Sequence, residues 1–386
     1  MNDKKSSTLL ALTAAALALP MASEPAKADP PDQKFTLGFK QSNYKEAPIA
    51  ADQLGLGSPE RYTIDVSHLK FKAPVSTDTE LTTSVIRETM SGASPWYVAP
   101  GADGEPLQVM SGATISEERT ELGVDFRSYN SNSEVTLSGG YSSENDYESV
   151  SFGFSGAWRL NQNLTTLSYG ANTSFDYIDP SDAESFDRPV HETKKRAGAM
   201  VGITQVATKT TLLSATLGFS VLDGYLSDPY KRAFVEGNTV RDSRPGQQEQ
   251  INLNLSLRQF FEGPGGALHA DYRYYTNNWE IDSHTLELSW YQNLGSDWQL
   301  IPSVRYYDQS AAVFYRPFYE TTRTDGFYSS DYRLSDFSAV SGQLKLSKTF
   351  TAFRFDLAYE TYSASGDHPG LLEYDLISLG LGYAFE

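Results

Sequence analysis

The 386-residue chain has no cysteine, only 5 methionines and fewer basic than acidic residues. The lack of cysteine excludes disulfide bonds, thiol catalysis and thiolate metal sites. With 31 Lys and Arg against 49 Asp and Glu, the formal net charge is -18. Nucleic acid is therefore not expected as a partner, because phosphate binding needs concentrated Lys and Arg.

The chain also lacks the run of roughly 18 apolar residues that a membrane-spanning helix needs. Its clearest apolar stretch, residues 9–19, is too short for that purpose. This stretch follows Lys4 and Lys5 and precedes an Ala-Lys-Ala pattern at 26–28. A positive start, a short apolar run and small residues in this order predict a cleavable secretory signal over residues 1–28.

Apolar residues elsewhere alternate with polar ones. Residues 251–258 read Ile-Asn-Leu-Asn-Leu-Ser-Leu-Arg, and the same alternation returns at 121–127 and 353–360. A period of two places the apolar set on one face of a β-strand and the polar set on the other. The 24 Tyr and 20 Phe also favour strands. We expect residues 29–386 to form one all-β domain.

The lengths of these segments and of their connections indicate which β-fold to expect. The segments are about 10 to 15 residues long, enough to cross a bilayer when tilted and longer than strands of ordinary sheets. Short turns are expected at 74–78, 130–132, 161–163, 207–209, 262–265, 294–297 and 349–351. Longer connections are expected at 45–60, 89–116, 143–147, 178–191, 223–247, 277–279, 309–333 and 363–373.

Alternating turns and loops are typical of a transmembrane antiparallel up-and-down β-barrel, with short periplasmic turns and long extracellular loops. Counting residues 35–44 as the first strand predicts about 16 strands, an even number as such barrels require. If residues 35–44 are not a strand, 14 is expected instead.

The last segment carries a further indication. Residues 377–385 alternate Ile, Leu, Leu, Tyr and Phe with Ser, Gly and Ala. This resembles the terminal aromatic signature that outer-membrane proteins present to the barrel assembly machinery, although Glu386 leaves Phe385 penultimate. We therefore expect an exported protein of the Gram-negative outer membrane, with membrane lipid and the assembly machinery as partners.

If the apolar face of each strand meets lipid, the opposite face lines the lumen, because charge in hydrocarbon costs about 2 to 4 kcal/mol per Arg or Lys. The predicted pore-lining residues are Asp125, Arg127, Arg196, Arg258, Asp271, Arg273, Glu287, Arg305, Arg354 and Asp356. They are compatible with a water-filled pore that has a charged constriction. They are also compatible with a lumen closed by ion-paired side chains.

One long loop combines flexible and rigid elements. The sequence Met-Ser-Gly-Ala occurs at 90–93 and again at 110–113, and Pro95, Trp96 and Tyr97 follow the first copy. Flexible Ser-Gly steps beside an aromatic knob predict a loop that folds inward and narrows the pore. The alternative is that these aromatics belong to the membrane-interface girdle. The predicted constriction residues are Ser91, Gly92, Pro95, Trp96, Tyr97, Ser111 and Gly112.

These motifs, together with Tyr-Leu-Ser-Asp-Pro-Tyr-Lys at 225–231 and Arg244-Pro245, resemble an uncharacterised family of predicted outer-membrane proteins, a domain of unknown function. The resemblance covers essentially the whole mature chain. It implies a barrel and an outer-membrane location, and it carries no established activity.

Catalytic and metal motifs are not evident. The five histidines, His68, His191, His269, His284 and His368, show no pair at metal-ligand spacing. The acidic loop residues Asp179, Asp182, Asp331 and Asp336 have no ordered calcium-ligand spacing. We expect neither an enzyme nor a cofactor. The two remaining functions are a porin-like channel for small polar or charged solutes and a structural barrel that holds or displays an exported partner protein.

Overall fold

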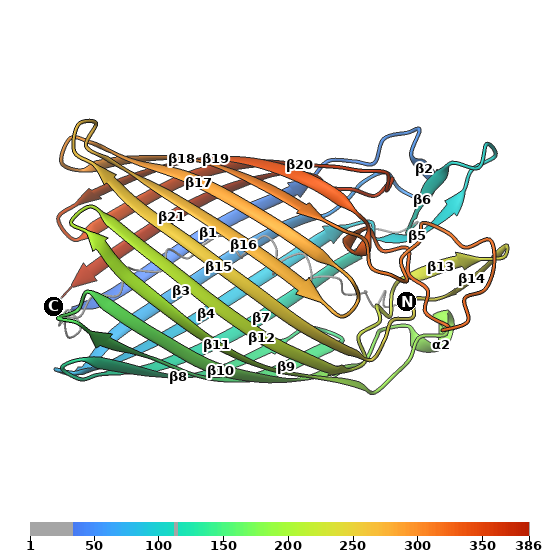
Figure 1. Cartoon of the computed structure of the whole chain (residues 1–386). Helices are drawn as coiled ribbons and strands as arrows, with labels where there is room; N and C mark the ends of the chain where they lie inside the picture. Colours follow the sequence, from blue (N-terminus) through green and yellow to red (C-terminus); the bar gives the residue numbers. More distant parts are fainter. Residues whose placement is uncertain (1–33, 112–114, 386) are drawn as a thin grey trace.

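A computed structural model describes residues 34–111 and 115–385. It shows a closed antiparallel β-barrel with a layer of loops across one end (Figure 1). The predicted signal, residues 1–28, and Gly112 lie outside the described residues. None of the helices in the described ranges is long and apolar enough to span a bilayer.

Sixteen strands form the barrel wall, and the shortest has 11 residues and the longest 17. They are β1 (Phe35–Glu46), β3 (Thr63–Ser76), β4 (Thr79–Gly92), β7 (Ile115–Tyr129), β8 (Ser133–Ser143), β9 (Tyr147–Leu160), β10 (Thr165–Ile178), β11 (Glu192–Thr208), β12 (Thr211–Gly224), β15 (Gln247–Phe261), β16 (Gly266–Asn277), β17 (Asp282–Leu294), β18 (Trp298–Gln309), β19 (Phe337–Phe350), β20 (Phe353–Ser365) and β21 (Glu373–Phe385).

The first and last strands close the barrel. Strand β1 pairs with β21 in a register that runs from Phe35 opposite Phe385 to Glu46 opposite Tyr374. The rings of Phe35 and Phe385 stack with centroids 5.5 Å apart. The prediction of 16 strands is therefore confirmed, because residues 35–44 do form a strand, and the 14-strand alternative is wrong.

The outward face of the wall is apolar. Leu255 on β15 is paired with Ala215 on β12 and Tyr272 on β16. Paired residues share one face of a sheet, and large apolar side chains on this face, such as Leu255 and Leu217, remain 42% and 50% exposed. A continuous exposed apolar surface of this kind is what a barrel presents to lipid.

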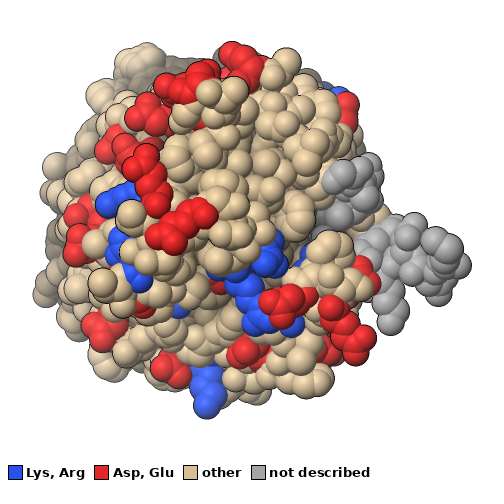
Figure 2. Space-filling view, turned by 90° about the vertical axis from the view of Figure 1, so that its right-hand side faces the viewer, with Lys and Arg blue, Asp and Glu red and all other residues tan. Residues whose placement is uncertain are grey.

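The two ends of the wall differ, as the lengths of the connections predict. Seven connections of two to four residues lie at one end, the turn end, together with Phe35 and Phe385. Eight connections lie at the other end, the loop end, and most of them are long. In the space-filling view onto the loop end, side chains of these loops cover the mouth, and acidic residues gather along parts of the rim (Figure 2).

The loops contain small elements of their own. Strands β2 (Leu54–Leu56), β6 (Pro106–Met110) and β5 (Pro95–Pro100) form a three-stranded sheet, and β13 (Arg232–Val235) pairs with β14 (Asn238–Arg241). The short helix α2 (Ala183–Phe186) and the 3-10 helix η1 (Tyr332–Leu334) complete the layer.

Two hydrophobic clusters attach the loops to the wall. One joins Tyr44, Tyr62, Ile64, Val66, Met90 and Leu376. The other joins Trp279, Ile281, Ala312, Phe314, Tyr315 and Leu334 of two connections, and Tyr275 of β16 in the wall packs against it. Burying side chains of this size contributes roughly 1.5 to 3 kcal/mol each. The loop layer is thus a packed part of the fold.

Candidate functional site

A network of buried ion pairs lies at the centre of the loop layer. We call five of the loops in this layer, residues 47–62, 93–111, 225–246, 310–336 and 366–372, the cap. Asp331, which caps η1, contacts Arg333 and lies 2.9 Å from Arg244 and 3.8 Å from Lys231. Burial by itself would raise the pKa of Asp331, but the Arg333, Lys231 and Arg244 cations hold it well below its usual range. The carboxylate therefore stays ionised and holds three cations together.

This network joins distant loops. Arg333 binds Asp228 at 2.7 Å, and Arg244 binds Asp242 at 2.7 Å. Lys231 Nζ also donates a hydrogen bond to the carbonyl oxygen of Pro95 at 3.1 Å. Charges buried without such partners would cost several kcal/mol each, so the loops are stable in this arrangement only as a set.

A second contact group ties the cap to the wall. Arg61 binds Glu46 of β1 at 2.7 Å and donates to the carbonyl oxygen of Gly370 at 3.1 Å. His368 Nδ1 accepts a hydrogen bond from the Gly370 amide at 2.8 Å, and its Nε2 lies 2.9 Å from the Ser330 carbonyl oxygen. Burial lowers the pKa of His368 to about 4. The ring is therefore neutral at neutral pH, with Nε2 as the donor.

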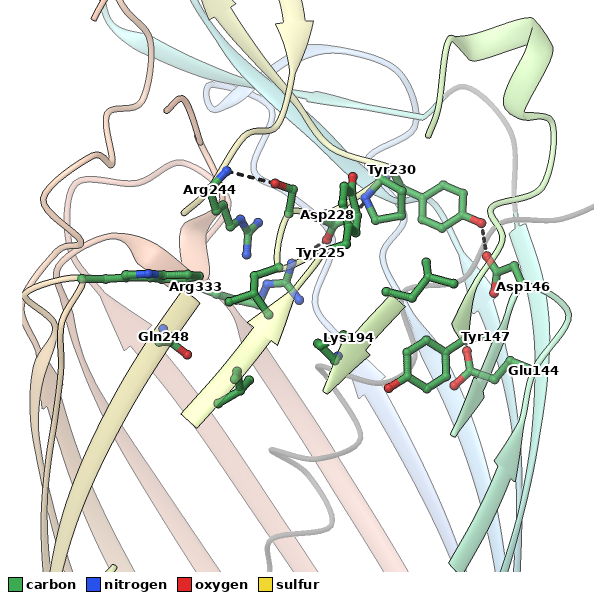
Figure 3. Close-up of a pocket in the computed structure, with 16 residues that line it drawn as sticks. Glu144, Asp146, Tyr147, Lys194, Tyr225, Asp228, Tyr230, Arg244, Gln248 and Arg333 are labelled. Carbon is green, nitrogen blue, oxygen red and sulfur yellow. Dashed lines mark hydrogen bonds and ion pairs between the residues drawn. The ribbon is translucent and has the colours of Figure 1, made fainter. Parts of the chain in front are cut away.

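Beneath the cap lies a cavity of about 280 Å³, which we call the mouth cavity (Figure 3). Its residues come from the ends of strands β9 to β12 and β15 and from four connections. They are Glu144, Asp146, Tyr147, Ile178, Lys194, Leu222, Tyr225, Leu226, Ser227, Asp228, Pro229, Tyr230, Arg244, Gln248, Trp279 and Arg333. Four of them are aromatic, and six are charged.

One side of the mouth cavity is acidic. Glu144 and Asp146 occupy the three-residue connection between β8 and β9, and both are buried. The Tyr230 hydroxyl donates a hydrogen bond to Asp146. Glu144 Oε1 is buried without a hydrogen bond, and the nearest cation, Arg119 Nε, lies 3.9 Å away. Burial, followed by the neighbouring Asp146 charge, raises the pKa of Glu144 to about 8.

The other side is cationic. Figure 3 places Arg244 and Arg333 across the pocket from Glu144 and Asp146. The carboxylate contacts of Arg244 and Arg333 all use Nε and Nη2. Within the described ranges, the Nη1 groups of the two arginines make no hydrogen bond to the protein, so each can still donate to a solute.

The ten predicted pore-lining residues all lie on the face of the wall opposite the exposed apolar side chains, as their strand pairings show. Arg258 pairs with His269, and Asp271 pairs with Glu287, which in turn pairs with Arg305. Several form ion pairs: Arg258 with Asp271 at 2.8 Å, Arg305 with Glu287 at 2.9 Å and Arg354 with Asp356 at 3.3 Å. The remaining members are Asp125, Arg127, Arg196 and Arg273, whose pairings place them on the same face.

The lumen is asymmetric. Charged residues such as Lys70, Arg119 and Glu287 line the inner face of β3 to β7 and of β15 to β20, whereas small residues dominate the middle of the inner face of β8 to β12. These are Ser138, Gly140, Ser151, Gly153, Ser155, Gly170, Gly198, Gly202 and Gly218. Small side chains leave room inside the barrel on that wall, so any narrowing of the lumen comes from the opposite wall and from the cap.

The predicted constriction residues are divided between wall and cap. Ser91 and Gly92 are the last residues of β4 and pair with β7, while Pro95, Trp96 and Tyr97 begin β5 within the cap. The Ser111 hydroxyl accepts a hydrogen bond from the Ser94 amide at 2.9 Å, so Ser111 belongs to the same loop. The segment contacts another loop of the cap, because the Val98 amide donates a hydrogen bond to the Ser330 hydroxyl at 3.3 Å.

The residues of the mouth cavity and of the buried network were not predicted as site residues. Most of them occur in irregular loops, where no periodicity marks which side chains converge. The one usable signal was the motif at 225–231 with Arg244, because it supplies Tyr225, Asp228 and Tyr230 to the cavity and Lys231 to the network.

Comparisons with known proteins agree with the barrel. A family model described as "Protein of unknown function (DUF3570)" matches residues 9–378. A bacterial polysaccharide outer membrane secretin superposes with a TM-score of 0.50 at 9% identity, covering 92% of this chain and 99% of the other. OpdK, an outer membrane protein of Pseudomonas aeruginosa, gives 0.44 at 11% identity over 92% of this chain and 98% of its own. The search of curated proteins finds no match.

At 9% identity the likeness to the secretin is one of fold alone. The shared feature is the β-barrel that spans almost the whole of both chains.

Proposed function

This chain belongs to the DUF3570 family, and we propose that it is a loop-capped channel of the Gram-negative outer membrane for small polar or charged solutes. The observation that carries the proposal is the charged inner wall of a sixteen-strand barrel, which leads to a mixed-charge cavity at the mouth.

A barrel of this size normally encloses water unless something fills it. The inner wall offers paired charges such as Arg305 with Glu287 and Arg258 with Asp271, and closely spaced charges of both signs orient a passing polar solute. The proposal assigns the residues no catalytic role and needs no cofactor.

The cap makes this a gated channel. Its ion pairs hold the loops across the mouth, so a solute reaches the mouth cavity only when at least one loop moves. The segment 95–110 is the best candidate for that movement, because β5 pairs with β6 and β6 pairs with β2, and neither strand pairs with the barrel wall. Its contacts with the other cap loops include the hydrogen bonds from Lys231 to Pro95 and from Val98 to Ser330.

Single-channel conductance in a planar bilayer tests the proposal. The wild-type protein is expected to show brief, small openings, and deletion of residues 95–110 should increase both the conductance and the open time. Asn238→Ala, at the exposed β13–β14 tip, changes a side chain that, among the described residues, hydrogen-bonds only to the carbonyl oxygen of Glu236. It serves as the control and should behave as wild type. Absence of conductance in every variant, including the deletion, would contradict a channel.

A second function follows from a different observation. The cap is packed and ion-paired, and the sheet β2–β6–β5 and the hairpin β13–β14 project from it (Figure 1). A rigid platform of this kind suits a structural barrel that holds or displays an exported partner protein. A barrel that folds and stays non-conducting after deletion of residues 95–110 would favour this function over the channel.

A further inference from the structure

We propose that the mouth cavity is a binding site for a short zwitterionic peptide, whose ammonium group binds Glu144 and Asp146 and whose carboxylate binds Arg244 and Arg333. This inference rests on the proposed channel function and names its solute class. Three observations carry it: an acidic side, a cationic side and an aromatic lining between them.

The acidic side suits a cationic ligand, because Arg119 Nε lies 3.9 Å from Glu144 Oε1 and donates its hydrogen bond to Ser142 instead. Glu144 is only 9% exposed and Asp146 5%, and Glu144 Oε1 is buried without a hydrogen bond. A buried carboxylate oxygen without a hydrogen bond is costly, and an ammonium group with three donors would satisfy it. No set of three or more His, Asp or Glu in the described part of the chain is arranged to hold a metal ion, so an organic cation suits this side better than a metal.

The cationic side requires an anion that can reach two guanidinium groups. Arg244 and Arg333 are fixed by Asp242, Asp331 and Asp228, so they do not need to rearrange to bind. A carboxylate can accept from the Nη1 groups of both, and hydrogen bonds between two charged groups are the strongest kind available. Prior fixation lowers the entropic cost of binding.

The lining between the two sides suits a peptide. Tyr147, Tyr225, Tyr230 and Trp279 all line the cavity, and aromatic faces attract both ammonium groups and small apolar side chains. Lys194 Nζ already lies 5.3 Å from the Tyr147 ring centroid. A volume of about 280 Å³ is near the lower limit of small-molecule sites, which favours two or three small residues over a larger ligand.

Calorimetric titration of the purified full-length protein in detergent with trialanine tests the assignment. Two matched ligands isolate the two ends: N-acetyl-trialanine lacks the ammonium group, and trialanine amide lacks the carboxylate. Each is expected to bind about tenfold more weakly or worse, as loss of one charge-assisted contact predicts. Equal binding of all three ligands, or no binding of trialanine, would overturn the proposal.

Glu144→Gln should reduce trialanine affinity to that of the acetylated peptide on the wild type and leave the acetylated peptide unaffected. Glu148→Gln, on the exposed outward face of β9, is the matched control and should change neither affinity. If Glu144→Gln fails to fold, the comparison of the three ligands on the wild type still decides. A wild type that conducts without binding trialanine overturns this inference alone, whereas binding without conductance supports the site and contradicts the channel.

Discussion

Asp228 and Arg333 lie 105 positions apart in the chain, and their Oδ2 and Nη2 atoms are 2.7 Å apart. This ion pair connects the loop between β12 and β15 to the loop between β18 and β19. Both residues also line the mouth cavity. This contact between two loops of the cap is thus also part of the cavity lining, so a movement that separates the two loops would also change the shape of the cavity.

The first prediction concerns the centre of the cap. Asp331→Asn leaves Arg244, Arg333 and Lys231 without their shared carboxylate, and breaking a buried ion pair costs about 3 to 5 kcal/mol. The loops should open while the barrel stays folded. Limited trypsin digestion in detergent should then cleave after Lys231, which is buried in the wild type, because proteases cut segments that open.

Asp325→Asn is the control for this change. Asp325 pairs with Arg323 at 2.5 Å, but its side chain is 39% exposed, and an exposed pair contributes about 1 kcal/mol or less. Trypsin should cleave this variant after Lys231 no faster than the wild type. If Lys231 is as well protected from trypsin in Asp331→Asn as in the wild type, the network does not hold the cap.

The second prediction concerns the orientation of the barrel in the membrane. Because the native chain has no cysteine, a thiol reagent can react only with a cysteine that is introduced. Single cysteines at Thr239 and Thr324 of the loop end should react with a membrane-impermeant maleimide on intact cells. Cysteines at Ser131 and Asp297 of the turn end should react only after the outer membrane is permeabilised. Labelling of the turn positions from outside would mean that the barrel is inverted.

A third prediction tests the two faces of the wall. Leu255→Arg places a charge on the outward face and should cost about 2 to 4 kcal/mol near the bilayer midplane. The amount of heat-modifiable folded protein in outer-membrane fractions should fall. Asn252→Arg, three positions earlier on the inner face opposite Gly218 and Tyr275, should assemble normally. Equal assembly of the two variants would contradict the lipid-facing assignment.

The fourth prediction is a loss of cap stability in acid, through His368. In the cap its pKa is lowered from 6.5 to about 4, whereas in an open loop the ring titrates near its ordinary value. The closed cap therefore has its full stability above pH 6.5 and loses it as the pH falls toward 4. The charged or aromatic groups near the ring are Asp331, Lys231, Arg61, Tyr315 and Tyr332.

Channel open time should therefore increase between pH 7 and pH 4.5. His368→Gln should weaken this pH dependence, since glutamine does not titrate. His191→Gln removes an exposed histidine whose side chain is 71% exposed, and it should keep the wild-type profile. An unchanged profile in His368→Gln would assign the acid response to another group.

The fifth prediction follows from Glu144. With a pKa of about 8 in the empty cavity, its carboxyl group is mostly protonated at pH 7. An arriving ammonium group lowers that pKa, so binding should release up to about one proton per trialanine. Calorimetry in buffers of different ionisation enthalpy measures this release. Glu144→Gln should abolish it, and an unchanged proton release in that variant would exclude Glu144 as the source.

The barrel itself could be read from the sequence, because its determinants are local. Alternation with period two assigns every residue in the range 251–258 to one face of the sheet, whichever strand is the partner. The observed strand pairings agree with this assignment. Turn lengths likewise follow from neighbouring residues. For the same reason the sequence could place the ten residues predicted to line the pore, Arg305 and Asp356 among them, on the face opposite the exposed apolar side chains.

The cap and the mouth cavity were decided by tertiary structure alone. Asp331 meets Arg244 from 87 positions away, and Tyr230 meets Asp146 from 84 positions away. Irregular loops have no period that shows which side chains converge. An acidic residue that pairs with a distant arginine therefore cannot be distinguished in the sequence from a solvent-exposed acidic residue of a loop. These residues come together only when the barrel closes, because closure fixes where the eight loops begin and end. The free energy of pairing buried charges also depends on partners that are distant in the chain, and the order of residues does not show which partners will meet.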